Sequence, residues 1–296
     1  LSAPDDAAFL VVEMGANHMG EITALCGTSI PTHGIITNIG TAHIEGFGSF
    51  ENVRKAKSEL YQSLRENNGT AIYNDENPIL CELASGMIKA VPYSAPGGHT
   101  LSTSPAGDDL MLLKVRAVID GHEHYFETGL FGSYNIDNVK AAMAIGLLFG
   151  VPVPEIIDAV SSYKPSNNRS QVTETGRNTV IRDAYNANPS SMEKAIASFA
   201  ALKTEKKMVI LGDMLELGSE SAHGHAAVIR QLRNIGDIKA VLIGPCFREA
   251  ATDFKAMLFG SSDAAAEWLR TESPEGYTIL VKGSRGMMLE KVFPLL

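Results

Sequence analysis

The sequence predicts an α/β protein of two domains. Short β-rich runs alternate with helical segments along the chain, which is typical of sheets covered by helices. The 296 residues are 45% hydrophobic and 20% charged, which is enough for two folded cores. Turn-forming residues around Pro165 and Asn167 interrupt the pattern. We therefore expect a boundary near Ser166, with one domain at 1–166 and another at 167–296.

The first domain should combine parallel and antiparallel strands. Two apolar runs are separated by a stretch long enough for a crossover, which predicts parallel neighbours, and an Asp-Gly pair at 120–121 predicts a hairpin. A Gly, Pro, Ser and Thr bias at 94–107 predicts a flexible loop. The expected strands are 8–12, 34–39, 70–73, 111–119 and 122–126, and the expected helices are 49–64, 138–149 and a short successor between Pro152 and Pro165.

The second domain should be a small doubly wound, Rossmann-like sheet. Its expected strands are 179–183, 208–212, 240–244 and 278–281, alternating with helices that begin near Ser190, Ser221, Cys246 and Gly286. In such a sheet, ligands bind beyond the carboxyl ends of the strands.

Composition excludes several classes. The net charge is -9 and the basic residues are scattered, so nucleic acid is not an expected partner. Cys26, Cys81 and Cys246 are odd in number and far apart, which indicates neither disulfides nor a zinc site and fits a reducing cytoplasm. Apolar runs fall short of the roughly 20 residues that span a bilayer. The chain begins at Leu1 and enters an apolar run at once, so we expect a fragment of a longer protein.

Two possible metal ligands follow the first two expected strands. Glu13 comes after one and His43 after the other, so their side chains should converge at one edge of the sheet. The alternative is a strand-end cap and a local hydrogen bond.

A lysine lies on the apolar stripe of the expected helix 49–64. Lys57 shares one face with Val53, Leu60 and Leu64. Burial disfavours the ammonium and leaves an amine that can react with carbon dioxide to form a carbamate. Alternatively, the stem packs while the charged head reaches water.

Three sequence segments resemble the central domain of Mur ligases of the MurF type. They are VVEMGANHMGEI at 11–22, NIGTAHIEGFGS at 38–49 and KAKSE at 55–59, in the family's order and spacing. The resemblance implies that Glu13 and His43 bind magnesium and that Lys57 is carbamylated. Manganese would tolerate the histidine better, whereas the carbamate would supply hard oxygens for magnesium.

Further segments resemble the parts of the family that bind the nucleotide. GSYNIDNVKAA at 132–142 implies that Asn135 and Asn138 contact the adenine of ATP, with helix capping as the alternative. DAYNANPSSM at 183–192 implies that Asp183 meets the ribose, although Arg182 stands where the family commonly has a second acidic residue. Arg169 matches an arginine that reaches nucleotide phosphate, and a solvated charge is the alternative.

GDMLELG at 212–218 and LVKGSRG at 280–286 also match the family. Together with the preceding block, they imply residues that bind the incoming dipeptide or assist closure: Tyr185, Asn186, Asn188, Asp213, Lys282, Ser284 and Arg285. The HGH spacing of His223 and His225 invites a metal hypothesis, but we expect both on a surface helix without a neighbouring Cys or acidic group. Only His225 matches the family, with no assigned role.

The resemblance implies that residues 1–166 are the remaining part of a Mur ligase central ATPase domain and that residues 167–296 form a Rossmann-like ligase domain. The activity implied is ATP-dependent addition of D-alanyl-D-alanine to UDP-N-acetylmuramoyl-tripeptide through an acyl phosphate, by a cytoplasmic monomer making peptidoglycan. The 296 residues contain no Gly-Lys dipeptide, so we expect the triphosphate loop and the uridine-binding domain upstream and no ligase activity in this chain alone. The other hypotheses are a catalytically silent Mur-like scaffold and a nucleotide-dependent oxidoreductase, and no GxGxxG supports the latter.

Overall fold

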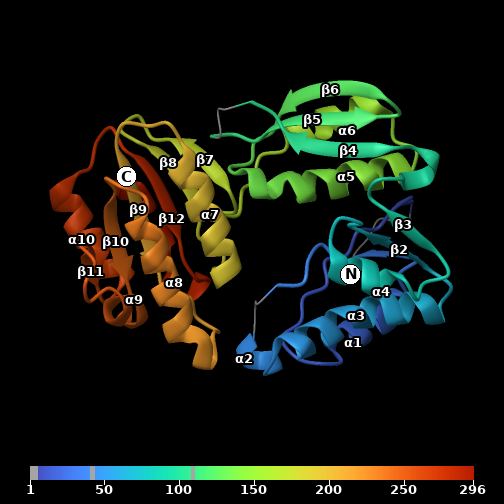
Figure 1. The fold of residues 1–296 in the computed structure, drawn as a ribbon, viewed down its shortest axis with the longest axis horizontal. Helices are drawn as coiled ribbons and strands as arrows, with labels where there is room; N and C mark the ends of the chain where they lie inside the picture. The colour runs from blue at the N-terminus through green and yellow to red at the C-terminus, as the bar shows by residue number, and fades with distance from the viewer. Residues whose placement is uncertain (1–5, 41–43, 108–110) are drawn as a thin grey trace. The chain divides into compact units, whose positions relative to one another are not determined.

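The computed structural model describes residues 6–40, 44–107 and 111–296. The chain divides into two compact units, Leu1–Pro92 and Tyr93–Leu296 (Figure 1). Among the helices of the described residues, none has both the length and the apolar composition that a membrane span requires.

The first unit contains a three-stranded parallel sheet in the order β1-β2-β3. Ser49 caps α3 by accepting a hydrogen bond from the Asn52 amide, and the helix buries Val53, Ala56, Tyr61 and Leu64 on one face. The expected helix at 49–64 and strand at 70–73 are therefore confirmed. The elements of this unit are α1 (Glu21–Ser29), β1 (His33–Ile35), α2 (Ile44–Phe47), α3 (Phe50–Glu66), β2 (Thr70–Tyr73), α4 (Pro78–Ala84) and β3 (Ala90–Pro92).

The predicted strand at 8–12 is wrong for the described residues, since this segment has no regular structure. Phe9 is 68% exposed and Val11 is 93% exposed, so the apolar run packs against little of the described chain. Its predicted parallel partner at 34–39 is reduced to β1, which pairs with β2 instead. The pattern was apolar enough for a strand, but a strand also needs a neighbour that supplies the ladder hydrogen bonds.

The second unit begins with a three-stranded antiparallel sheet in the order β4-β5-β6. The predicted hairpin is confirmed: Asp120 and Gly121 have φ of 49° and 82°, as a tight turn requires. The predicted flexible loop at 94–107 is wrong, because Leu101–Pro105 pairs with β5 and Leu101 is buried. These elements are β4 (Leu101–Pro105), β5 (Lys114–Ile119), β6 (His122–Glu127), α5 (Ile136–Leu148) and α6 (Val153–Ser162).

A six-stranded sheet in the order β11-β10-β9-β12-β8-β7 forms the rest of this unit. All neighbours are parallel except β7, which runs antiparallel to β8. The doubly wound prediction is therefore confirmed. The elements are β7 (Gln171–Glu174), β8 (Thr179–Asp183), α7 (Pro189–Ala201), β9 (Lys207–Gly212), α8 (Ser221–Arg233), β10 (Lys239–Ile243), α9 (Pro245–Ala250), β11 (Met257–Phe259), α10 (Ser262–Glu272) and β12 (Thr278–Lys282).

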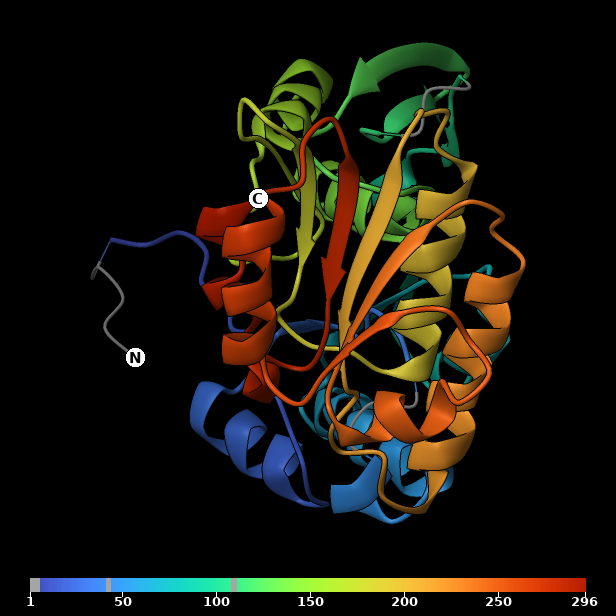
Figure 2. The same ribbon diagram turned by 90° about the vertical axis from the view of Figure 1, so that its left-hand side faces the viewer.

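The sheet has a hydrophobic core on each face because successive strand residues point to opposite sides. Ile181 and Val209 pack with α7 and α8 on one face, whereas Val180 and Ile210 pack with α10 and the C-terminal turns on the other. Figure 2 shows α7 and α8 on one side of the strands and α10 on the other. Burial on both faces explains why these strands are continuous apolar runs.

Two helix predictions in this domain need correction. Helix α10 was not among the predicted helices, although Ser261 caps it by accepting from the Ala264 amide and three alanines follow. The helix predicted to begin near Gly286 is instead three short 3-10 turns, Arg285–Met287, Leu289–Lys291 and Phe293–Leu295. Met288 has φ of 51°, a left-handed conformation that interrupts a continuous helix.

Candidate functional site

The predicted site residues of the second domain gather at the carboxyl edge of the six-stranded sheet. Asp183 ends β8, Asp213 follows β9, and Lys282 ends β12. The parallel register places Lys282 directly opposite Asp183. Charged groups from separate motifs therefore meet where an open α/β sheet binds its ligands.

Asp183 and Lys282 form a buried ion pair. The Lys282 ammonium donates to Asp183 Oδ2 at 2.6 Å, and the two side chains are only 3% and 11% exposed. The second oxygen of Asp183 accepts from the Ser170 amide at 2.9 Å. Both carboxylate oxygens thus have a partner, which offsets the cost of removing the charge from water.

A chain of hydrogen bonds connects this ion pair to the segment that opens α5. The Asn135 amide donates to the Ser170 hydroxyl at 3.1 Å and to the Phe131 carbonyl at 2.8 Å. Asn138 donates in turn to Asn135 Oδ1 at 2.9 Å. The Asn135 side chain makes no cap to α5, so the capping hypothesis does not describe it.

Tyr134 reinforces the same junction. Its hydroxyl lies 2.9 Å from the Ser170 hydroxyl. Burial, with added repulsion from the Asp183 charge, raises the pKa of Tyr134 far above its ordinary range. The phenol therefore stays neutral and serves as a hydrogen-bonding group.

Arg169 is exposed and stacks on an aromatic ring. Its guanidinium carbon lies 3.7 Å from the centroid of the Tyr185 ring, and that of Arg285 lies 5.8 Å from the same centroid. Asn168 and Ser170, on either side of Arg169, have φ of 56° and 50°. Such left-handed backbone is costly for Ser and is often found at functional sites. Two guanidinium groups therefore lie close to the ring of one partly exposed tyrosine.

Two predicted substrate contacts in this block have local structural partners. Asn188 caps α7: its side chain accepts from the Ser191 amide at 2.9 Å, within a full capping box. Asn186 accepts from the Ala187 amide through its own side chain, and its carbonyl accepts from Lys282 at 3.4 Å.

Asp213 and Ser284 organise the turns that follow β9 and β12. Asp213 accepts through both oxygens at 2.9 Å from the amides of Cys246 and Phe247, which open α9. The Ser284 hydroxyl accepts from the Leu215 amide at 2.8 Å, and the Ser284 amide donates to the Asp213 carbonyl at 3.2 Å. Both residues are buried, so they hold backbone rather than face solvent.

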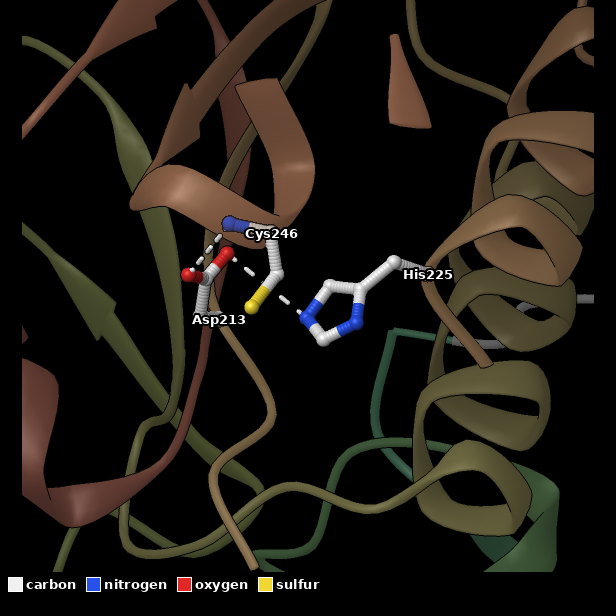
Figure 3. Close-up of side chains that lie close together, drawn as sticks. All are labelled: Asp213, His225 and Cys246. Carbon is white, nitrogen blue, oxygen red and sulfur yellow. Dashed lines mark hydrogen bonds and ion pairs between the residues drawn. The ribbon is translucent and has the colours of Figure 1, made fainter. Parts of the chain in front are cut away.

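The prediction that His225 lies on a helix surface without an acidic or Cys neighbour is wrong. His225 is fully buried in α8, and Nε2 lies 3.6 Å from Asp213 Oδ1. Figure 3 shows the side chains of Asp213, His225 and Cys246 pointing toward one another. His223 is exposed, as expected. The missed signal was helical spacing, because Val228, Ile229 and Leu232 continue the buried face of His225.

These three side chains could offer metal ligands within 4.8 Å of one another, but their atoms already have partners. Nε2 of His225 has one lone pair and accepts from the Met214 amide at 3.0 Å. Both oxygens of Asp213 accept backbone hydrogen bonds. Burial, with added repulsion from Asp213, raises the pKa of the Cys246 thiol and disfavours the thiolate that a metal binds. The cluster is therefore a hydrogen-bond network.

In the first unit, Lys57 is partly buried on α3 and donates to the Asn38 carbonyl at 2.9 Å. Burial lowers the pKa of this lysine. Glu13 is exposed, and His43 lies outside the described residues.

Glu59 is a residue of this region that sequence reasoning missed. Its carboxylate accepts from the amides of Gly20 and Thr23 at 2.7 and 2.9 Å, at the beginning of α1. An acidic group at a helix N-terminus compensates the helix dipole. Glu59 thereby connects the segment that follows Glu13 to the helix that carries Lys57.

The six-stranded sheet, with helices on both faces and charged residues at its carboxyl edge, defines a doubly wound α/β protein. The chain belongs to the Mur ligase family: the family model of the Mur ligase middle domain matches residues 1–146, and that of the Mur ligase glutamate ligase domain matches residues 168–285.

Curated relatives bear the name UDP-N-acetylmuramoyl-tripeptide--D-alanyl-D-alanine ligase. The chain is 30% identical to the one from Bacillus subtilis, over 99% of the chain and 65% of that protein. It is also 30% identical to the one from Escherichia coli, over 96% of the chain and 64% of that protein. The chain thus spans less than two thirds of the length of these relatives.

Solved structures agree with this family. MurF from Acinetobacter baumannii matches with a TM-score of 0.80 and 27% identity, over 95% of the chain and 62% of that structure. MurF ligase from Thermotoga maritima in complex with ADP has the same fold, with a TM-score of 0.80 and 23% identity, over 95% of the chain and 65% of that structure.

Proposed function

We propose that the chain is the greater part of a MurF-type ligase, which uses ATP to join D-alanyl-D-alanine to UDP-N-acetylmuramoyl-tripeptide. The observation that carries the proposal is the hydrogen-bonded chain Asn135, Ser170, Asp183 and Lys282. It joins, at the carboxyl edge of the sheet, the residues that the family resemblance assigns to adenine and ribose.

The reaction proceeds by two transfers. The tripeptide carboxylate oxygen takes the γ-phosphoryl group of ATP, which gives an acyl phosphate and ADP. The dipeptide amine then attacks the acyl carbon, the bond from that carbon to the phosphate oxygen breaks, and phosphate leaves as the amine loses a proton. The protein's main task is to position the reacting groups and to stabilise charge.

On the nucleotide side, Asn135 and Asn138 contact the adenine, Asp183 the ribose and Arg169 a phosphate. A carboxylate has about four lone-pair sites. Because Asp183 uses two of them for Lys282 and Ser170, it retains capacity for ribose hydroxyl groups. Lys282 sets the orientation of this carboxylate.

On the dipeptide side, exposed and buried residues take different parts. Tyr185 and Arg285 are accessible, and the Arg285 guanidinium suits a carboxylate in two parallel hydrogen bonds. The buried or locally bonded residues form the frame that holds these two groups: Asn186, Asn188, Asp213, Lys282 and Ser284.

The proposed cation is magnesium, with manganese as the alternative. Glu13 supplies an accessible carboxylate, and the lowered pKa of Lys57 favours the neutral amine that a carbamate requires. Oxygen ligands of this kind fit a hard cation, with His43 as the third proposed ligand. When bound, the cation would offset the charge of the phosphates.

We also propose a cytoplasmic monomer with a domain division near Ser166. The domain division is supported by the interval between the two matched family models, which end at residue 146 and begin at residue 168.

Nucleotide binding and phosphate release test the proposal together. The chain should bind a fluorescent ATP analogue weakly, and Asp183→Asn should weaken binding by about tenfold, the effect of one lost charge-assisted hydrogen bond. Asp253→Ala, at an exposed carboxylate, serves as the control. The chain has no Gly-Lys dipeptide and therefore no triphosphate loop of the expected kind, so by itself it should release no phosphate from ATP. The full-length ligase that contains this chain should release phosphate only when both substrates are present. Equal binding by both variants, or a full-length protein without this release, would contradict the proposal.

A further inference from the structure

The turn that follows β9 is held by a histidine on α8. His225 is fully buried, and both of its ring nitrogens have backbone partners. Nδ1 lies 2.7 Å from the Ser221 carbonyl, and Nε2 lies 3.0 Å from the Met214 amide nitrogen.

These two partners determine the protonation state of the ring. A carbonyl can only accept, so Nδ1 carries a hydrogen. A backbone amide can only donate, so Nε2 must be unprotonated. The contacts therefore select the neutral imidazole with its hydrogen on Nδ1.

The groups that surround the His225 ring do not favour another protonation state. Asp213 approaches from the end of β9, and Cys246 and Phe247 from α9. Ser221, on the ring's own helix, is within 3.4 Å of Nδ1. The Asp213 oxygens already accept from two amides. A second hydrogen on the ring would make Nε2 a donor facing the Met214 donor.

The turn held by His225 connects to the end of β12. Next to Met214, the Leu215 amide donates to the Ser284 hydroxyl at 2.8 Å, and the Ser284 amide donates to the Asp213 carbonyl. Arg285 follows Ser284 directly. One imidazole lone pair thus supports the backbone on which an exposed arginine of the proposed dipeptide side is mounted.

We propose that His225 is a positioning residue, which holds the turn after β9 as a neutral hydrogen-bond acceptor and thereby orients Ser284 and Arg285. The functional part of this inference rests on the proposed ligase activity. The tautomer and the hydrogen bond to Met214 stand independently of that activity.

Nuclear magnetic resonance of this chain tests the structural part. The ¹⁵N spectrum of His225 should show Nε2 unprotonated and Nδ1 protonated. His225→Gln places an amide oxygen near Nε2, so the Met214 amide should keep its protection from hydrogen exchange. His225→Leu should speed exchange at Met214 by about tenfold, the effect of one lost hydrogen bond, with the Leu211 amide unchanged. His223→Leu, at the exposed histidine of the same helix, should change neither.

Three results would overturn the inference: a protonated Nε2, unchanged exchange at Met214 in His225→Leu, or stoichiometric zinc binding that shifts the Nε2 resonance. Zinc alone is the probe for the last of these, because it would take the lone pair assigned to Met214.

Kinetics of the full-length protein test the functional part. His225→Leu should raise KM for D-alanyl-D-alanine by about tenfold and leave KM for ATP nearly unchanged, and His225→Gln should restore most of the difference. Equal effects on both substrates, or no rescue by Gln, would refute positioning. A wild-type protein without ligase activity would refute the proposed function, while the resonance and exchange results would still decide the tautomer.

Discussion

At the scale of residues, the carboxyl edge of the six-stranded sheet contains an ion pair that is buried away from water. Lys282 and Asp183 are 99 positions apart in the chain, and the register of β12 against β8 brings them together. A buried ion pair adds little net stability, but loss of one partner leaves an uncompensated charge. The pair is therefore better suited to fixing the Asp183 carboxylate than to stabilising the fold.

Removal of the Lys282 charge should be strongly destabilising. We expect Lys282→Met to lower the free energy of unfolding by about 3–5 kcal/mol, and the double variant with Asp183→Asn to recover part of that loss. Urea denaturation measures both. The exposed pair Lys291 and Asp263, at 2.8 Å, provides the control, since Lys291→Met should cost less than about 1 kcal/mol. Equal costs for the two lysine substitutions would contradict a buried pair.

Lys57 should form a carbamate at lower pH than ordinary lysines. Burial lowers its pKa from the ordinary 10.5, so at a given pH below that value a larger fraction of the amine is neutral and able to react with carbon dioxide. In ¹³C-bicarbonate, we expect a carbamate resonance in the wild-type chain, its loss in Lys57→Met and its retention in Lys55→Met, which changes an exposed lysine of the same helix. A resonance that persists without Lys57 would disprove the assignment.

At the scale of elements, hydrogen bonds connect the end of strand β9 to the beginning of helix α9. Asp213, after β9, accepts from the first amides of α9. Gly244, before α9, has φ of 120°, and a Cβ there would lie 2.2 Å from Asp213 Oδ2. Only glycine fits at this position, because any side chain would displace the carboxylate. The turns of the candidate site are thus closely packed where they leave the sheet.

The capping role of Asn188 can be separated from a substrate role. Asn188→Ala removes the cap of α7 and should cost about 1 kcal/mol, whereas Asn188→Ser keeps an acceptor and should cost much less. Thermal unfolding of both variants of this chain measures the difference. If Asn188 only caps, Asn188→Ser in the full-length protein should keep the wild-type KM for the dipeptide. A raised KM in the thermally stable Ser variant would instead favour direct contact.

At the scale of the whole molecule, the proposed boundary near Ser166 lies within the second compact unit. That unit begins at Tyr93 and so includes residues on both sides of Ser166. Phe131, which is fully buried, and Tyr134 connect the two sides, because they pack against the core shared by α7 and α8. The core on the other face of the sheet draws its buried residues only from 180–296. The six strands also lie entirely beyond Ser166.

We expect residues 167–296 to fold by themselves with reduced stability. One core would be complete and the other would lack Phe131, so the free energy of unfolding should fall by about 3–5 kcal/mol, as for removal of a large aromatic side chain. Circular dichroism and calorimetry of this segment would show one cooperative transition. Compact but non-cooperative behaviour would place the boundary nearer Tyr93.

Local chemistry made much of this structure predictable. The strand at 179–183 follows from a short apolar run, and α3 from its helical spacing and the Ser49 cap. The positions of Asp183, Asp213 and Lys282 at strand ends were predictable for the same reason. The segment at 8–12 failed as a strand because a partner strand is not a local property.

The sequence by itself determined the doubly wound fold and the charged residues that lie at its carboxyl edge, because apolar periodicity and strand ends are local. Only the tertiary structure decided which groups meet: Lys282 with Asp183, Asn135 with Ser170, and His225 with the Met214 amide. A hydrogen bond extends about 3 Å, so partners distant in the chain are decided by strand register and helix packing.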